Sequence, residues 1–178
     1  IQKASSTITT VPQASALTYN GFDQTLVAGG TADLGEVVYS LSETGTYSAA
    51  IPTGVDAGDY EVWYKLEGDS NHSGTAPAKV DAAINPAPLT LTDATIKTRP
   101  YQYDYRGAEV SGLIFTGLVN GETLALNTDY TASGEFESAD AGENKKVTIT
   151  VTLTSAKASN YTFTGGSVSF TGIITKAD

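Results

Sequence analysis

The sequence predicts an all-β protein made of two modules, at residues 1–86 and 87–178. Apolar and polar residues alternate with a period of two over much of the chain, and no segment has the spacing of an amphipathic helix. A four-residue pattern of Ile, any residue, Lys or Pro, and Ala begins at residues 1, 84 and 174, at intervals of 83 and 90 residues. Such regular self-similarity is typical of a tandem array, so each interval should be one small β-domain.

A second repeat lies inside the modules. Tyr19-Asn20 is 37 residues before Asp56-Ala57-Gly58, and Tyr103-Asp104 is 37 residues before Asp140-Ala141-Gly142. Both patterns are displaced by 84 residues, so they keep one register through the interior of a module. We therefore expect two copies of one structural frame.

In the first module, alternating segments are separated by turn-forming residues such as Asn20-Gly21 and Glu43-Thr44-Gly45. These segments predict seven strands. The expected strands lie near residues 6–10, 16–19, 24–28, 35–42, 46–51, 58–67 and 76–85.

In the second module, the clearest predicted strand is at 147–154, where four apolar residues alternate with four threonines. The closing strand, at 167–175, places Val168, Phe170 and Ile174 on one face. Asn120-Gly121 lies between two apolar runs and predicts a hairpin turn.

The joint between the modules is Asn85-Pro86-Ala87-Pro88. Its two prolines have a fixed φ, so we expect an extended and fairly stiff spacer. The same joint pattern occurs at both ends of the chain, and the chain contains no Met. We therefore expect it to be a piece of a longer array.

Composition excludes several classes of function. The net charge is −10, divided as −7 for residues 1–86 and −3 for residues 87–178, which makes nucleic acid an unsuitable partner. There is no Cys and one His, so zinc sites of the Cys and His type are excluded. No apolar run reaches the length of a membrane span. We expect no cofactor and no membrane insertion.

The segment Asp56-Ala57-Gly58-Asp59-Tyr60-Glu61-Val62 resembles the D-x-G-x-Y-x-C signature of immunoglobulin (Ig) domains, with Val62 in place of Cys. The resemblance implies a tyrosine corner, in which the Tyr60 hydroxyl bonds to backbone a few residues upstream. It implies structural roles for Asp56, Gly58 and Tyr60. In the second module the Tyr position holds Asn144, so a phenol cannot close that corner.

The first module is also similar to bacterial Ig-like repeats of the MBG type, through Leu17-Thr18-Tyr19-Asn20-Gly21 and Gly68-Asp69-Ser70-Asn71-His72. The second is similar to the YDG type through Tyr103-Asp104 and Ala158-Ser159-Asn160-Tyr161, although Tyr105 stands where that type has Gly. Such repeats occur in large secreted or wall-attached bacterial proteins. The resemblance implies two tandem Ig-like β-sandwiches at an extracellular or cell-surface location, with neighbouring modules as partners.

Aromatic side chains are the candidate binding residues. Strand alternation places Trp63 on an outer face among charged side chains, where it is either a platform for a sugar or protein ligand or a surface covered by a neighbouring strand or by the joint. Tyr101, Tyr103 and Tyr105 alternate around a turn and leave the same two alternatives.

Other chemistries have weaker support. Asp56, Asp59, Glu61 and Asp69 supply oxygen ligands, but their spacing fits no EF-hand loop, so we expect turn or solvated roles. His72 lies in a polar loop and has no second His with which to build a triad, and we expect no catalysis.

A Lys-to-Asn isopeptide bond is a further alternative, which a mass measurement would test because each bond loses one ammonia. The pairs to consider are Lys79 with Asn71 and Lys146 with Asn160. Most lysines of the chain alternate onto polar faces, which argues against such a bond in a core.

The expected function is that of a non-catalytic stalk or spacer that projects other domains of a bacterial cell-surface or secreted protein. The alternative is an adhesive or carbohydrate-binding module that uses Trp63 or the 101–105 tyrosines. Its partner would be a host or cell-wall glycan or protein.

Overall fold

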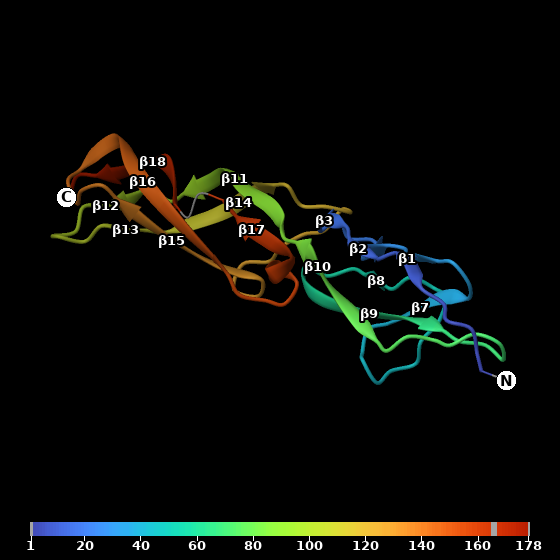
Figure 1. The fold of residues 1–178 in the computed structure, drawn as a ribbon. Coiled ribbons are helices and arrows are strands. Elements are labelled where there is room, and N and C mark those ends of the chain that lie inside the picture. The colour runs from blue at the N-terminus through green and yellow to red at the C-terminus, as the bar shows by residue number, and fades with distance from the viewer. Residues whose placement is uncertain (1, 165–166, 178) are drawn as a thin grey trace. The chain divides into compact units, whose positions relative to one another are not determined.

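The computed structural model describes residues 2–164 and 167–177 and shows an all-β protein (Figure 1). The chain divides into two compact units, unit 1 (Ile1–Pro86) and unit 2 (Ala87–Asp178). Among the described residues, the one helix is a short 3-10 turn, η1 (Ala158–Asn160). No helix of these residues is long and apolar enough to cross a membrane.

Unit 1 is built on a four-stranded sheet of order β3-β10-β9-β7, in which β10 is antiparallel to β9 and parallel to β3. Three two-stranded pairs, β1–β6, β2–β5 and β4–β8, complete its described strands. The strands are β1 (Ile8–Thr10), β2 (Gln13–Ala14), β3 (Ala16–Thr18), β4 (Gln24–Thr25), β5 (Val27–Ala28), β6 (Thr31–Ala32), β7 (Glu36–Ser40), β8 (Thr53–Gly54), β9 (Gly58–Glu67) and β10 (Ala78–Asn85).

The core of unit 1 lies against the inner face of this sheet. Val62, Tyr64 and Leu66 of β9 are buried, whereas Trp63 and Lys65 between them are half-buried. This confirms the predicted alternation of the strand at 58–67. Leu26 and Ile84 are also buried and add apolar surface from outside β9. Because the chain has no disulfide, the stability of unit 1 comes from this packing.

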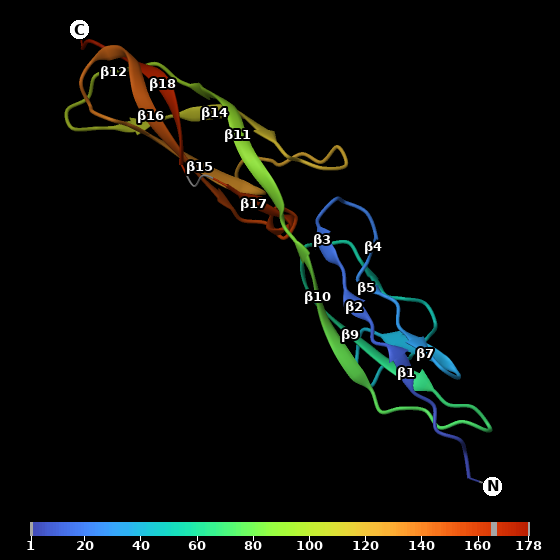
Figure 2. The same ribbon diagram turned by 45° about the horizontal axis from the view of Figure 1, so that its top comes forward.

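Unit 2 has two sheets, of order β14-β11-β17 and β12-β18-β16-β15-β13 (Figure 2). Its strands are β11 (Ala87–Ile96), β12 (Arg99–Pro100), β13 (Gly107–Ala108), β14 (Val110–Thr116), β15 (Tyr130–Phe136), β16 (Gly142–Leu153), β17 (Tyr161–Phe163) and β18 (Ser167–Thr175). One buried cluster combines Leu91 of the first sheet with Phe136 and Ile149 of the second, so the core lies between the sheets.

Aromatic rings add directional packing to this core. Phe115 meets Tyr130 edge to face at 5.0 Å between ring centroids, and it meets Phe163 in the same manner at 6.2 Å. Such pairs stabilise a core by about 0.5–1.5 kcal/mol beyond their buried area.

Two sequence predictions about local structure are wrong. The expected strand at 46–51 does not form: Ser48 makes an isolated bridge to Tyr39, and the surrounding residues are irregular. Asn120-Gly121 does form a tight turn, with φ of 50° and 69° and a hydrogen bond from the Glu122 N–H to the Val119 carbonyl. The flanking residues are not paired as strands, so this turn does not make a hairpin.

The connection between the units is one residue long. β10 ends at Asn85 and β11 begins at Ala87, which leaves Pro86 between two paired strands. At the ends of the chain, Ile1 and Asp178 lie outside the described residues, so the structure does not describe the first joint in full.

Candidate functional site

Trp63 lies on the outer face of the unit 1 sheet, in the middle strand β9. Its cross-strand neighbours are Ser40 of β7 and Lys79 of β10. The Trp63 indole donates a long hydrogen bond of 3.4 Å to the Glu61 carboxylate. The ring is half-buried, so it is less open to a ligand than the sequence alone indicates.

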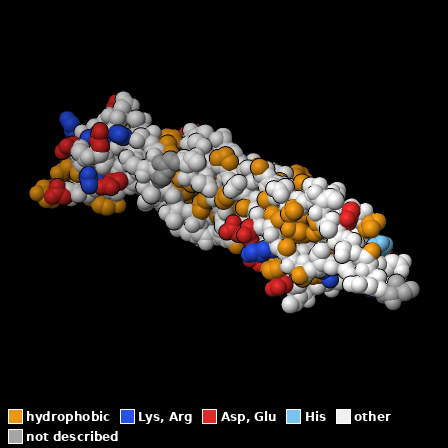
Figure 3. Space-filling view, in the orientation of Figure 1, with side chains coloured by type: hydrophobic (Ala, Val, Ile, Leu, Met, Phe, Trp, Pro, Cys, Tyr) orange, Lys and Arg blue, Asp and Glu red, His pale blue; other side chains and the backbone are white. Residues whose placement is uncertain are grey.

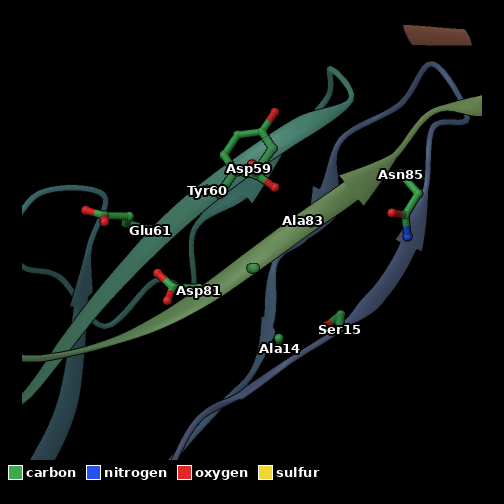
Figure 4. Close-up of a pocket in the computed structure, with 9 residues that line it drawn as sticks. Ala14, Ser15, Asp59, Tyr60, Glu61, Asp81, Ala83 and Asn85 are labelled. Carbon is green, nitrogen blue, oxygen red and sulfur yellow. The ribbon is translucent and has the colours of Figure 1, made fainter.

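An open hollow of about 560 Å³ lies in unit 1, and Glu61, the acceptor of the Trp63 indole bond, is one of its lining residues (Figure 4). Carboxylates of Asp59, Glu61 and Asp81 lie at it, together with the side chain of Asn85. On β10 the small Ala83 lies between Asp81 and Asn85, and it is paired with Asp59 of β9. The remaining lining residues are Ala14, Ser15, Tyr60 and Ala82.

Charge on this face is partly neutralised within the sheet. Lys79 forms ion pairs with Glu61 and with Asp81, the latter at 3.0 Å. The hydrogen bond from Lys79 is the main cause that lowers the pKa of Glu61, and it raises the pKa of Lys79 itself. The lowered pKa keeps the Glu61 carboxylate ionised at neutral pH, so this side of the hollow is suited to hydroxyl or ammonium donors and unsuited to anions.

A second aromatic residue lies on the same outer face. The Lys65 ammonium is 4.5 Å from the centroid of the Tyr47 ring, and Lys65 alternates on β9 with the inward residues Tyr64 and Leu66. Tyr47 belongs to the segment in which a strand is expected but does not form. Sequence reasoning missed Tyr47 because only the fold of this loop brings it to the sheet.

The three unit 2 tyrosines surround a tight turn after β12. The Tyr105 N–H bonds to the Gln102 carbonyl at 3.3 Å, and Asp104 has a φ of 51°. Tyr103 is 83% exposed, Tyr105 53% and Tyr101 36%, so the turn presents Tyr103 most strongly to solvent. Lys97, Arg106 and acidic side chains lie at the same end of the unit, where Figure 3 shows both signs of charge together.

Tyr105 has a packing role that accounts for part of its surface. The Arg99 guanidinium lies 5.0 Å from the Tyr105 ring centroid and 5.3 Å from that of Phe136, so it is held between the two rings. The same guanidinium donates hydrogen bonds to the Pro100 and Tyr105 carbonyls. Tyr105 is thereby fixed against unit 2, whereas Tyr103 projects.

The residues assigned to a tyrosine corner meet in unit 1. The Tyr60 hydroxyl donates a 2.7 Å hydrogen bond to the Asp56 carbonyl across the turn before β9, and β9 begins at Gly58. Burial is the main cause that raises the pKa of Tyr60, and the Asp56 carboxylate adds to it. The neutral phenol that can donate this bond is therefore favoured.

His72, shown pale blue in Figure 3, is bound to its own loop. Its Nδ1 lies 2.9 Å from the Asp69 carboxylate, which also accepts the Asn71 and His72 backbone N–H groups at 2.7 Å. These bonds lower the pKa of Asp69 to about 2. The geometry is that of a loop brace.

The structure does not bring together the metal or cross-link candidates. Among the described residues, no group of three or more His, Asp or Glu side chains is placed to hold a metal ion. Lys79 is paired with carboxylates instead of Asn71. Lys146 is exposed, whereas Asn160 is 3% exposed, so that pair does not form a common core site.

Comparison with known proteins finds one similarity, in the second half of the chain. A family model described as the YDG domain matches residues 85–169, which places the second module's resemblance on most of unit 2. No curated protein and no solved structure matches the chain. Unit 2 is thus similar to the YDG domain, and the likeness of unit 1 to MBG-type repeats remains a prediction from its motifs.

Proposed function

We propose that this chain is a non-catalytic spacer within a bacterial cell-surface or secreted protein, formed by two Ig-like β-sandwich modules. The observation that carries the proposal is the joint. Asn85 is paired with Thr18 in unit 1, Ala87 is paired with Tyr161 in unit 2, and Pro86 alone lies between them. A linker with one free residue, whose φ is fixed, separates domains without giving them much freedom.

The candidate site supports this proposal by its own geometry. Two polar groups outside the cores brace local structure. Tyr60 braces the turn before β9, and Asp69 braces the loop that contains His72. Function has to be argued from a site, and these residues stabilise local structure instead of converging on a reacting group. Partners under this proposal are the adjacent modules of the same polypeptide.

Solution scattering tests the spacer. We expect the natural chain to give a narrow distribution of distances between its units, and a variant with a short Gly-Ser insertion after Pro86 to give a broader one, because Gly-Ser segments behave as flexible coils. A distribution equally broad in both proteins would overturn the stiff-spacer proposal. Location is tested separately, by antibody labelling of the native protein on intact cells, where labelling only after lysis would contradict a surface location.

One observation favours a second function, adhesion through a glycan. The hollow of about 560 Å³ in unit 1 combines carboxylates and the Asn85 amide with the nearby Trp63 ring, and concave sites of this kind take small polar ligands. A glycan array with the whole chain tests it, using Trp63→Ala and, because Trp63 is half-buried, the conservative Trp63→Phe.

Each outcome of the array decides between the functions. Binding that Trp63→Ala removes and Trp63→Phe retains, with unchanged melting temperature, supports the glycan function. Binding that survives both variants but is lost in Tyr103→Ala would place the glycan site at the exposed turn of unit 2. Absence of binding to any glycan leaves the spacer as the better account.

A further inference from the structure

The first and last segments of unit 2 run parallel to each other along the unit. Ala87, Pro88 and Leu89 pair with residues 161–163, which lie 74 positions further along the chain. Arg99 and Pro100 pair with Ile174 and Thr175, 75 positions further along. Because the two offsets are almost equal, residues 87–89 and residues 99–100 are held in nearly the same register against the described residues 161–163 and 174–175.

Unit 1 has the same arrangement. Ala4 forms a parallel bridge with His72, 68 positions further along, and residues 16–18 pair in parallel with 83–85, at an offset of 67. The two units share this feature although their other strand pairings differ. We call these two sets of parallel pairs the terminal clamps.

Parallel terminal strands determine how tension reaches the hydrogen bonds. In unit 2 the chain enters at Ala87, at the start of β11, which is parallel to β17, and it leaves after Thr175, at the end of β18, which is parallel to β12. Pulling the ends apart slides the two segments past each other, so the bonds between them carry the load together. Pulling open an antiparallel pair from one end would load its bonds one at a time.

Specific bonds extend each clamp beyond the regular pairs. In unit 2 the Tyr101 N–H donates to the Thr175 carbonyl at 2.9 Å, and the Thr164 N–H donates to the Leu89 carbonyl at 3.1 Å. In unit 1 the Tyr19 N–H donates to the Asn85 carbonyl at 2.8 Å, and the Ala4 N–H to the Asn71 carbonyl at 2.8 Å.

Burial protects the clamps from water. Leu89 and Ile174 in unit 2, and Ile84 in unit 1, are fully buried clamp residues. Water competes less well for backbone hydrogen bonds beside such side chains, so these bonds are less readily replaced while they carry load.

We propose that the terminal clamps make each unit resistant to tension applied along the chain, which is the load that a surface spacer would transmit. The inference rests on the proposed spacer function for its biological purpose, but the resistance itself follows from the strand registers. Its signature is a dependence of the unfolding force on the direction of pulling.

Single-molecule pulling of the whole 178-residue chain tests this signature. The chain has no Cys, so one introduced Cys is a unique handle. In the first geometry the load is applied at the two termini. In the second it is applied between the C-terminus and Ala141→Cys, an exposed position next to Gly142, which pairs with Ile174 at one end of the antiparallel strands β16 and β18.

The terminal geometry should give two unfolding events, each releasing about 30 nm of chain. The force that unfolds unit 2 in this geometry should exceed the force in the Ala141→Cys geometry, because the slanted parallel bonds are loaded together. Equal forces in the two geometries would overturn the clamp. That result would leave the scattering test of the spacer unaffected, whereas a failed spacer test would leave the directional difference intact.

A variant that lacks one backbone donor tests whether a particular clamp bond resists the load. Tyr101→Pro removes the N–H that donates to Thr175, and Tyr101→Ala removes the same side chain while keeping that donor. We expect Tyr101→Pro to lower the terminal unfolding force below that of Tyr101→Ala, with little difference between them in the Ala141→Cys geometry. Equal terminal forces for the two variants would show that this clamp bond carries no load.

Discussion

Unit 1 and unit 2 support equivalent turns in different ways. Strand β9 begins at Gly58 and β16 at Gly142, the two glycines of the motif that recurs after 84 residues. In unit 1 the Tyr60 hydroxyl closes the preceding turn on the Asp56 carbonyl. In unit 2 the corresponding residue is Asn144, and no phenol is available at that place.

Unit 2 uses a lysine and a bulge instead. Asn144 has a φ of 54°, within a register shift between Gly142 and Lys145. The Lys145 ammonium then donates a 2.6 Å hydrogen bond to the Ser138 hydroxyl, which donates to the Asp140 carboxylate at 3.0 Å. The comparison teaches that the repeat specifies where the strand starts, while the group that braces the turn is replaceable.

The largest effect on stability should come from a substitution in the core of one unit, which should leave the other unit unchanged. Phe136→Ala removes a ring that is 1% exposed, and we expect it to lower the unfolding free energy of unit 2 by about 3–5 kcal/mol. Trp63 is the one Trp of the chain and lies in unit 1, so its fluorescence follows unit 1. Urea unfolding should show an unchanged Trp63 transition and an earlier transition for unit 2 amide signals.

The matched variant is Leu66→Ala, in the core of unit 1, where the leucine is also 1% exposed. It should shift the Trp63 transition and leave unit 2 signals unchanged. If either variant shifted both units equally, the units would not be thermodynamically independent.

A smaller effect should distinguish the two turns. Tyr60→Phe removes the hydroxyl that bonds to Asp56, and we expect unit 1 to lose about 1 kcal/mol of stability by Trp63 fluorescence. Tyr103→Phe is the control and is followed by the unit 2 amide signals, because Tyr103 lies in unit 2; its side chain is 83% exposed, so the loss of a hydroxyl should change nothing. Equal stability of the natural chain and Tyr60→Phe would show that the corner bond contributes nothing.

The unit 2 turn should respond to backbone conformation. Asn144→Ala places at this positive φ a residue that lacks the short polar side chain with which Asn can bond to nearby backbone. It should lower the stability of unit 2 by roughly 0.5–1 kcal/mol. Asn144→Gly should be close to neutral because Gly adopts this φ readily. Thermal unfolding of unit 2 measures the stability of both variants. Equal stability of Asn144→Ala and Asn144→Gly would show that the positive φ at this position does not matter.

The smallest effect concerns acid. The pKa of Asp69 is lowered to about 2 by its bonds to His72 and Asn71, below the ordinary value of 3.8. A carboxylate with a lowered pKa stabilises the folded state above its unfolded pKa, and this contribution is lost as the pH falls from about 4 through 2. Asp69→Asn should remove that part of the acid sensitivity of unit 1.

Carboxyl NMR titration gives the pKa of Asp69 directly, and Trp63 fluorescence follows unit 1 in acid. Asp33 and Glu61 also have lowered pKa values in unit 1, so Asp69→Asn should retain the acid sensitivity that these two groups contribute. An Asp69 that titrates at its ordinary value would show that the loop brace is not maintained in solution.

The local sequence pattern predicted the strands in which apolar and polar residues alternate. The strand at 58–67 has the predicted bounds, and so does the strand at 167–175. The strand expected from residue 147 begins earlier, at Gly142, because its polar first residues are held by pairing with β18 and not by an apolar alternation. The short strands β2 and β6 were missed because two residues are too few to show a period.

The candidate site was predicted only in part. Alternation placed Trp63 on the outer face correctly, but its half-buried state depends on Ser40 and Lys79, which other strands supply. Tyr47 and the hollow near Ala83 were not predicted, because each depends on residues distant in sequence. Among the tyrosines, the sequence did not distinguish Tyr103 from Tyr105, which packs against Arg99.

The sequence by itself determined that this protein is all-β, where its long strands alternate and where its internal pattern repeats, because a strand's facing and a turn's residue preferences are local properties. Only the tertiary structure decided which strands pair. The parallel pairs in unit 2 (87–89 with 161–163, 99–100 with 174–175) and in unit 1 (4 with 72, 16–18 with 83–85) join residues that are 67 to 75 positions apart. Such register depends on how whole sheets bury their apolar faces, and no local pattern specifies it.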